Sequence, residues 1–165
     1  MKNNTSTIQS HYPFPNKGNN KWGIRFSAKG TASHKVYDQK VIVFSADGSK
    51  LGSFNGSSTP NPFKPKDSSI KGTDAYPFVK AGTYRIKQGS HKGKPALVVN
   101  GNANVPTTDI NPNFPNQGSF ANYIHVHWGY SDTWKGSAGC PTIDPSQWKK
   151  FLSIIPNGEG FIIIP

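Results

Sequence analysis

One short segment, YIHVHWGYSDTWKGSAGCPTI (residues 123–143), holds most of the side chains that can do chemistry. It contains the only cysteine, Cys140, and two of the five histidines, His125 and His127. A thiolate is a strong nucleophile, and an imidazole within hydrogen-bond reach can take the thiol proton. The segment therefore predicts a cysteine nucleophile with one of the two histidines as its base.

The residues around the cysteine suggest how an acyl intermediate would be held. Gly139 tolerates backbone torsions that other residues avoid, and the N–H groups of Gly139 and Cys140 predict an oxyanion hole. Ser137 either orients this loop or binds substrate, or it is a turn hydroxyl bonded to local backbone. The neighbouring candidate substrate contacts are Tyr123, Trp128 and Thr142.

The two histidines lie in a predicted strand, NYIHVHW. Alternate side chains of a strand share a face, so His125 and His127 point together toward a cleft. The opposite face is apolar and is expected to meet the core: Ile124, Val126 and Trp128. Alternate Cα atoms lie about 6.5–7 Å apart, so only one histidine reaches the thiol. We favour His127 as the base, with His125 as the alternative.

The Ile-His strand followed by SAGC resembles the catalytic domain of the L,D-transpeptidase family, in which a His-Gly strand precedes a loop and Ser-His-Gly-Cys. Upstream, SSTP (57–60) and VKAGTYRI (79–86) are similar to the family's Thr-Pro-x-Gly strand entry, so the resemblance covers about residues 36–143. Ala138 replaces the family's second histidine, Pro141-Thr142 replaces Ile/Val-Arg, and the His-to-Ser loop is short. The chain is similar to a divergent, compact branch found among phage-linked and interbacterial-toxin proteins.

The resemblance implies an enzyme that modifies peptidoglycan stem peptides without a metal or cofactor. Cys140 would attack the carbonyl between the L-centre of a diamino acid and the following D-amino acid, giving a thioester. An amine acceptor then gives transpeptidation or D-amino-acid exchange, and water gives L,D-carboxypeptidase activity. The implied partners are the stem peptide and, for an antibacterial effector, an immunity protein; a monomer is expected.

The charge and hydropathy of the chain suggest where it acts. The net charge is +11, which favours polyanions such as an anionic cell wall. No nucleic-acid-binding motif and no apolar run of about 20 residues is present, so we expect neither a nucleic-acid nor a membrane partner. The N-terminus lacks the apolar region of a secretory signal. We therefore expect a protein made without a signal peptide and delivered to the wall or periplasm by a specialised secretion system or a phage-linked route.

The whole chain predicts a mainly β fold, an L,D-transpeptidase-like sandwich or barrel. An irregular basic arm is expected over residues 1–34 and the catalytic domain over 35–165. Residues 36–54 predict a hairpin turning at Asp47-Gly48. Strands are predicted at 82–87 and 95–99, joined by a loop that contains His91, and at 160–164. Turn-rich segments cover 55–77 and 100–119.

One short helix is predicted after the cysteine. Asp144 is the expected N-cap, Pro145 suits the first turn, and Gln147 completes a capping box. Pro156 and Gly158 end the helix. Its apolar stripe has helical spacing: Trp148, Phe151, Leu152 and Ile155.

Two other readings remain open at this point. A zinc site could form from the His125-x-His127 pair and Cys140, completed by His91, His34 or Asp132. Alternatively, the chain is a non-catalytic module that binds walls or glycans by stacking sugars on tryptophans: Trp22, Trp128 and Trp134.

Overall fold

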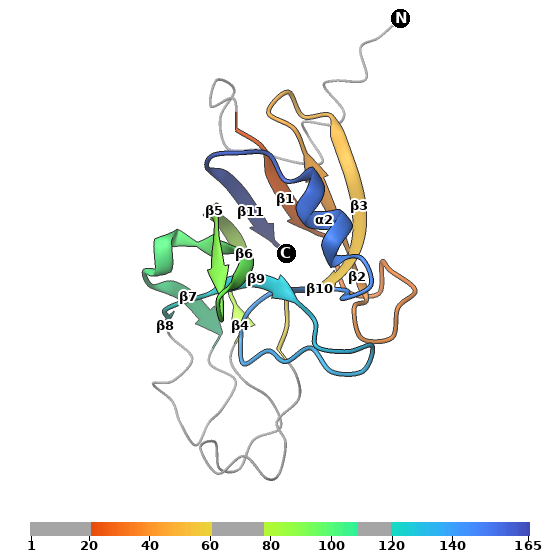
Figure 1. The fold of residues 1–165 in the computed structure, drawn as a ribbon. Helices are drawn as coiled ribbons and strands as arrows, with labels where there is room; N and C mark the ends of the chain where they lie inside the picture. The colour runs from red at the N-terminus through yellow and green to blue at the C-terminus, as the bar shows by residue number, and fades with distance from the viewer. Residues whose placement is uncertain (1–20, 61–77, 109–119) are drawn as a thin grey trace, which may run out of the picture.

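Eight strands form a closed barrel (Figure 1). The computed structural model describes residues 21–60, 78–108 and 120–165. Around the barrel the order is β1 (Gly23–Phe26), β11 (Gly160–Ile164), β5 (Gly82–His91), β6 (Lys94–Val99), β9 (His125–Trp128), β10 (Thr142–Ile143), β3 (Lys50–Ser57) and β2 (Gln39–Phe44).

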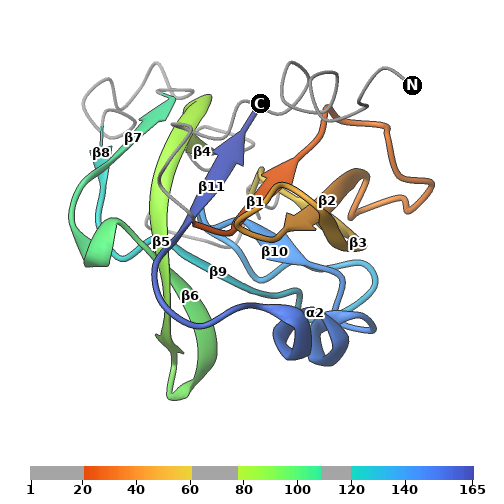
Figure 2. The same cartoon turned by 90° about the horizontal axis from the view of Figure 1, so that it is seen from above.

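A second, three-stranded sheet consists of β4 (Phe78–Val79), β7 (Val105–Thr108) and β8 (Phe120–Ala121). The helix α2 (Trp148–Ile154) lies on the opposite side of the barrel from this sheet in both views (Figures 1 and 2). The predicted mainly β class with one short helix after the cysteine is confirmed. Within the described ranges, no helix has the length and apolar character needed to cross a membrane.

Alternating side chains build the core, as the hairpin of β2 and β3 illustrates. Val41 and Val43 are completely buried, whereas Lys40 and Ile42 are only partly covered. The predicted turn is confirmed: Gly48 has a φ of 87°, and the backbone N–H of Ser49 donates to the Asp47 carboxylate at 2.9 Å. The hairpin therefore forms from its local pattern and its turn chemistry together.

The hairpin of β5 and β6 is longer than the sequence predicted. Its register runs to His91 opposite Lys94, leaving only Lys92 and Gly93 in the turn. Both turn residues have positive φ, 50° and 75°, as a two-residue hairpin turn with matching twist requires. His91, expected in a loop, is the last residue of β5. A rigid strand end therefore holds its side chain.

The irregular arm predicted over residues 1–34 is corrected in its described part. β1 pairs in parallel with β11 and antiparallel with β2. Trp22 and Phe26 are buried in the core, so apolar burial overrides the Asn- and Gly-rich composition of this region. Residues 1–20 lie outside the described residues, as do 61–77 of the first turn-rich segment. The second, predicted over 100–119, contains the 3-10 turn η1 (Asn100–Asn102) and β7, with 109–119 outside the described part.

The helix starts three residues later than predicted, at Trp148 instead of Pro145, because Asp144 and Gln147 have other partners. The Asp144 carboxylate accepts from the N–H and hydroxyl of Ser146, at 2.9 and 2.7 Å, within a turn that precedes α2. The Gln147 side chain accepts from the N–H of Asn55 at 2.6 Å instead of closing a capping box. Gln147 is the N-cap position, and no side chain caps it. The turn thus ties the helix to β3.

Gly129 is expected to be intolerant of any side chain. A Cβ built there would lie 1.7 Å from the hydroxyl of Tyr37, which is completely buried and donates to the Ser131 carbonyl at 2.6 Å. Because this ring cannot move away freely, Gly129→Ala should lower the free energy of unfolding by about 1–3 kcal/mol. Urea denaturation measures this, and an unchanged midpoint would contradict the close packing of Tyr37.

Candidate active site

Parallel pairing of β9 with β10 brings the cysteine beside the histidines. His127 pairs with Thr142, so Cys140 lies level with His125. The backbone N–H of His125 donates to the Cys140 sulfur at 3.5 Å, and the thiol points to the Tyr123 carbonyl at 3.9 Å. Cys140 is partly exposed at the edge of the core. The thiol is therefore half-buried against the core and is held by two backbone groups.

The loop before the cysteine is organised by the Ser137 hydroxyl. It donates to the Cys140 carbonyl at 2.6 Å and accepts from the Gly139 N–H at 3.1 Å, and Ser137 itself is buried. Gly139 has a φ of 151°, which disfavours any residue with a side chain. The Ser137 hydroxyl therefore bonds local backbone, as the turn-hydroxyl alternative predicted, and these bonds shape the loop. Because the Gly139 N–H is already engaged, the Cys140 N–H is the donor left for an oxyanion in the described part of the chain.

Two long-range contacts fix the segment that carries this loop. Lys135 is buried and donates to both oxygens of Thr59, at 3.1 and 3.2 Å, and to the Pro60 carbonyl at 3.3 Å. Burial lowers the pKa of Lys135 to about 8. Tyr37 holds the start of the loop through the Ser131 carbonyl. Residues Thr59 and Pro60 of the SSTP segment thus contact the loop that leads to Cys140.

Three histidines from two strands form one cluster. The Nδ1 atoms of His91 and His125 lie 2.8 Å apart, and His125 Nε2 lies 2.8 Å from Asn102 Oδ1. The rings of His91 and His127 stack with centroids 4.3 Å apart and planes 5° from parallel. His127 Nδ1 donates to the Trp128 carbonyl at 2.7 Å. Both ring nitrogens of His125 are therefore engaged, whereas His127 keeps Nε2 as a lone pair.

Burial changes the predicted open arrangement of the histidines. His127 is only 1% exposed and His125 9%, so they do not line an open cleft. Burial lowers the pKa of His127 to about 4, partly opposed by the Trp128 carbonyl and reinforced by His91, His125 and Lys92. The pKa values of His91 and His125 are also lowered, chiefly by burial. The cluster is neutral at pH 7.

Burial also affects the Cys140 thiol, in the opposite direction to the histidines. Burial raises the pKa of Cys140, against the favourable effects of the His125 backbone N–H and the Lys92 charge. With the pKa of His127 far below 7, the resting site holds a neutral thiol and a neutral imidazole. A preformed imidazolium–thiolate pair, as in many cysteine enzymes, is therefore not the ground state here.

The predicted substrate contacts divide into exposed and buried side chains. Tyr123 is 67% exposed beside the sulfur, with a φ of 56°, and Trp128 is partly exposed next to the rings of His91 and His127. Thr142 is completely buried, and its hydroxyl has no hydrogen-bond partner in the described part of the chain. Tyr123 and Trp128 can therefore meet a ligand, whereas Thr142 does not face solvent.

A basic and aromatic surface adjoins the cluster at the β5–β6 turn. Lys92 donates to the Tyr130 hydroxyl at 2.6 Å and lies over its ring, and Lys94 lies 5.4 Å from the centre of the Trp128 ring. The rings of Trp128 and Tyr130 stack at 6.5 Å, and Tyr130 is 43% exposed. This surface suits a ligand that carries negative charge and apolar or sugar faces.

The zinc alternative finds no support in this geometry. No group of three or more His, Cys, Asp or Glu side chains in the described ranges is arranged to hold a metal ion. The lone pairs of a ring lie in its own plane, so the stacked rings of His91 and His127 do not converge on one ion. His34 instead accepts from the N–H groups of Val36 and Tyr37, both at 3.0 Å.

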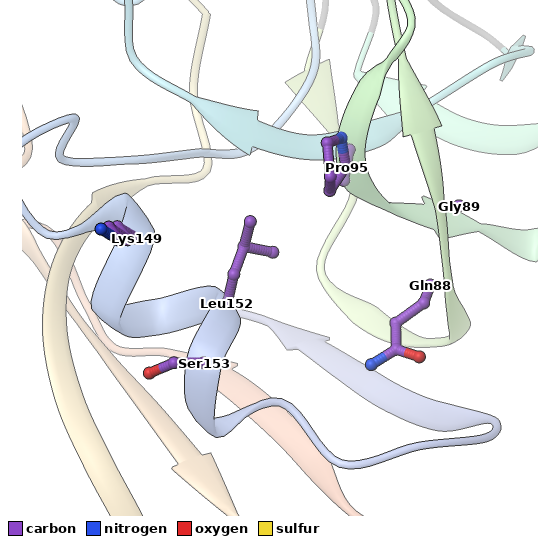
Figure 3. Close-up of a pocket in the computed structure, with 7 residues that line it drawn as sticks. Gln88, Gly89, Pro95, Lys149, Leu152 and Ser153 are labelled. Carbon is purple, nitrogen blue, oxygen red and sulfur yellow. The ribbon is translucent and has the colours of Figure 1, made fainter.

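A separate pocket of about 450 Å³ lies between α2 and the β5–β6 hairpin (Figure 3). Leu152 projects from the helix toward the hairpin that carries Gln88 and Pro95. The pocket carries no cysteine or histidine, so the nucleophile chemistry lies elsewhere. Its lining consists of Gln88, Gly89, Pro95, Ala96, Lys149, Leu152 and Ser153.

The sequence does not predict the positions of two members of the cluster, Asn102 and His91. Asn102 carried no signal, because an asparagine in an Asn- and Gly-rich turn is ordinary. His91 was considered only as a metal ligand. A two-residue hairpin turn at Lys92-Gly93, predictable from glycine, would have placed His91 at a strand end. Comparisons with protein-family models, curated proteins and solved structures found no match.

Alkylation of Cys140 tests the neutral thiol directly, since the chain has only one cysteine. The rate with iodoacetamide should be slow at pH 7 and should still rise above pH 8.5, about the ordinary cysteine pKa. In urea, the rate should level off as expected for an ordinary thiol. Intact-mass spectrometry follows the reaction, and a native plateau below pH 8 would indicate a preformed thiolate instead.

Stability should fall in acid because the buried His127 must stay neutral. Its folded pKa of about 4 lies below the unfolded value of about 6.5, so the unfolded chain binds the proton first. The free energy of unfolding should therefore decrease by about 3 kcal/mol from this group as pH falls from 6.5 to 4. Urea titrations of wild type and His127→Gln measure this, and parallel pH curves for the two proteins would contradict it.

Proposed function

We propose that the chain is a cysteine-dependent acyl-transfer enzyme acting on peptidoglycan stem peptides, of L,D-transpeptidase or L,D-carboxypeptidase type. The observation that carries this proposal is the half-buried Cys140, level with His125 and with its sulfur held by the His125 backbone N–H. Gly139 and Ser137 keep the loop in a conformation that leaves the Cys140 N–H for an oxyanion. The order strand-His, loop, Ser-x-Gly-Cys supports the same chemistry.

His127 is proposed as the base. An orienting group on one ring nitrogen and a lone pair on the other are what a general base needs. His127 donates from Nδ1 to the Trp128 carbonyl and so offers Nε2. His125 lies closer in register, but Asn102 and His91 occupy its two nitrogens. The hydrogen bonds thus favour His127, with His125 as the alternative to be tested.

The proposed reaction begins from a neutral pair. As the Cys140 sulfur attacks the stem-peptide carbonyl, its proton moves to His127 Nε2, and the carbonyl oxygen becomes an oxyanion near the Cys140 N–H. Collapse breaks the C–N bond, the imidazolium returns the proton to the leaving amine, and a thioester remains. An amine or a water molecule then attacks the thioester, loses its proton to His127, and the thiolate leaves and is reprotonated.

Incubation with purified stem peptides and muropeptides tests the reaction by mass spectrometry. We expect loss of a terminal D-alanine, its exchange, or a new crosslink, each abolished in Cys140→Ala. EDTA should have no effect, whereas iodoacetamide should inactivate. His127→Ala should lower kcat/KM by about 10²–10⁴-fold.

The outcomes separate the possible bases and functions. A larger loss in His125→Ala than in His127→Ala would reverse the assignment of the base. Unchanged muropeptides with folded wild-type protein would refute the proposed activity. Circular dichroism of each variant controls for misfolding.

A second candidate is a non-catalytic wall-binding module, favoured by several exposed aromatic residues. Phe120 is 63% exposed and Tyr123 67%, and Trp128 and Tyr130 stack beside two lysines. On this reading, Cys140→Ser would still sediment with isolated sacculi and keep its biological effect. On the enzymatic reading the effect is lost with the thiol.

We also propose that the substrate is reached outside the producing cell, as an effector or a phage-linked wall enzyme. The net charge of +11 supports an anionic polymer as the target. An antibacterial effector of this kind requires an immunity protein in the producing cell. Toxicity on periplasmic targeting, and none for Cys140→Ala, would support this route.

A further inference from the structure

A chain of hydrogen bonds fixes the protons on two of the clustered histidines. Asn102 Oδ1 can only accept, so His125 donates to it from Nε2 across 2.8 Å. His125 is neutral, so its Nδ1 is an acceptor, and the contact of 2.8 Å requires His91 to donate from its own Nδ1. The protons therefore lie on Nε2 of His125 and on Nδ1 of His91.

This series of hydrogen bonds ends at a ring nitrogen that has no partner. His91 Nε2 is buried and has no hydrogen bond in the described part of the chain. The preceding contacts leave it as a lone pair. Protonating it would create a charged, buried donor without an acceptor, against a parallel His127 ring 4.3 Å away. The stacked pair therefore resists protonation, and the orientation of one ring determines that of the other.

Asn102, which begins this series of hydrogen bonds, lies in an unusual turn. Asn100, Gly101 and Asn102 have successive φ values of 49°, 60° and 68°. Residues other than glycine adopt this conformation at a cost, and such strain concentrates at functional sites. The Asn102 carbonyl also accepts from the Tyr123 N–H at 3.4 Å, and the Tyr123 carbonyl faces the thiol. The turn thus contacts both the histidines and the backbone beside Cys140.

We propose that Asn102, His125 and His91 are positioning residues that hold the ring of His127 in plane and unprotonated, with Nε2 ready to take the Cys140 proton. This inference rests on the proposed roles of His127 and Cys140. His91 acts on His127 through the stacked rings, and Asn102 acts on His91 through His125. None of the three exchanges a proton with substrate in this scheme.

Asn102→Gly removes the first acceptor of the hydrogen-bond series. The variant destabilises the turn little, because glycine adopts positive φ freely. Asn100→Gly is the matched control: it has the same conformation, but its side-chain oxygen accepts from the Arg85 N–H at 3.3 Å, away from the cluster. Asn102→Asp is the rescue, since a carboxylate oxygen can accept the same hydrogen bond and aspartate also tolerates this conformation. Circular dichroism and thermal melting confirm that all three fold.

Nitrogen-15 NMR of the histidine rings reads the protons directly, without a substrate. In wild type and Asn100→Gly we expect His125 protonated on Nε2, and His91 and His127 on Nδ1. In Asn102→Gly the single forms of His125 and His91 should become mixtures, and the titration of His127 should move up toward the ordinary histidine pKa. Asn102→Asp should restore the proton on Nε2 of His125.

Activity on muropeptides provides the second readout. Asn102→Gly should lower kcat by about ten- to a hundredfold through a misplaced base, with KM little changed. Asn100→Gly should match wild type. A proton on Nε2 of His91 in wild type, or identical ring spectra in Asn102→Gly and Asn100→Gly, would overturn the inference. If the ring spectra change as expected but wild type leaves muropeptides intact, the hydrogen-bonded chain stands and the proposed enzymatic function fails.

Discussion

The site depends on one backbone constraint, the in-register parallel pairing of β9 with β10. The N–H of His127 donates to the Pro141 carbonyl at 3.2 Å, and that of Gly129 to Ile143 at 2.8 Å. Two residues back along both strands, the His125 N–H donates to the Cys140 sulfur in the place of a ladder carbonyl. Strand pairing therefore determines the position of Cys140, the proposed nucleophile, relative to the surrounding side chains.

Burying three imidazoles together avoids buried charge in the resting site but makes His127 a weak base. Buried charge is expensive, and an ion pair sealed from water gains little net stability, so a neutral thiol and imidazole are the cheaper resting state. The cost is a weak base, because the pKa of His127 of about 4 leaves little driving force for removing the thiol proton. In the proposed reaction, proton transfer would therefore accompany attack on the carbonyl, where the developing oxyanion compensates for it.

The sequence predicts local features of the fold better than relationships across the barrel. The Asp47-Gly48 hairpin and the strand at 160–164 follow from turns, alternation and spacing within about twenty residues. The contribution of His91 and Asn102 depends on how β5, β6 and β9 are aligned. No local pattern specifies that alignment. The helix start predicted at Asp144-Pro145 was wrong for a related reason. The side chain of Gln147, expected to cap the helix, bonds to Asn55, which is distant in sequence.

Lys92 affects the two halves of the proposed proton transfer in opposite ways. Its charge lowers the pKa of Cys140 and also those of His91 and His127. A nearby cation favours a thiolate and disfavours an imidazolium, so it favours the state in which the sulfur has lost its proton and the rings remain neutral. In the proposed scheme, the same bias favours return of the proton from His127 to the leaving amine. Lys92 lies in a two-residue turn, and its ammonium donates to the Tyr130 hydroxyl. The fold therefore holds this charge in place near Cys140 and the histidines.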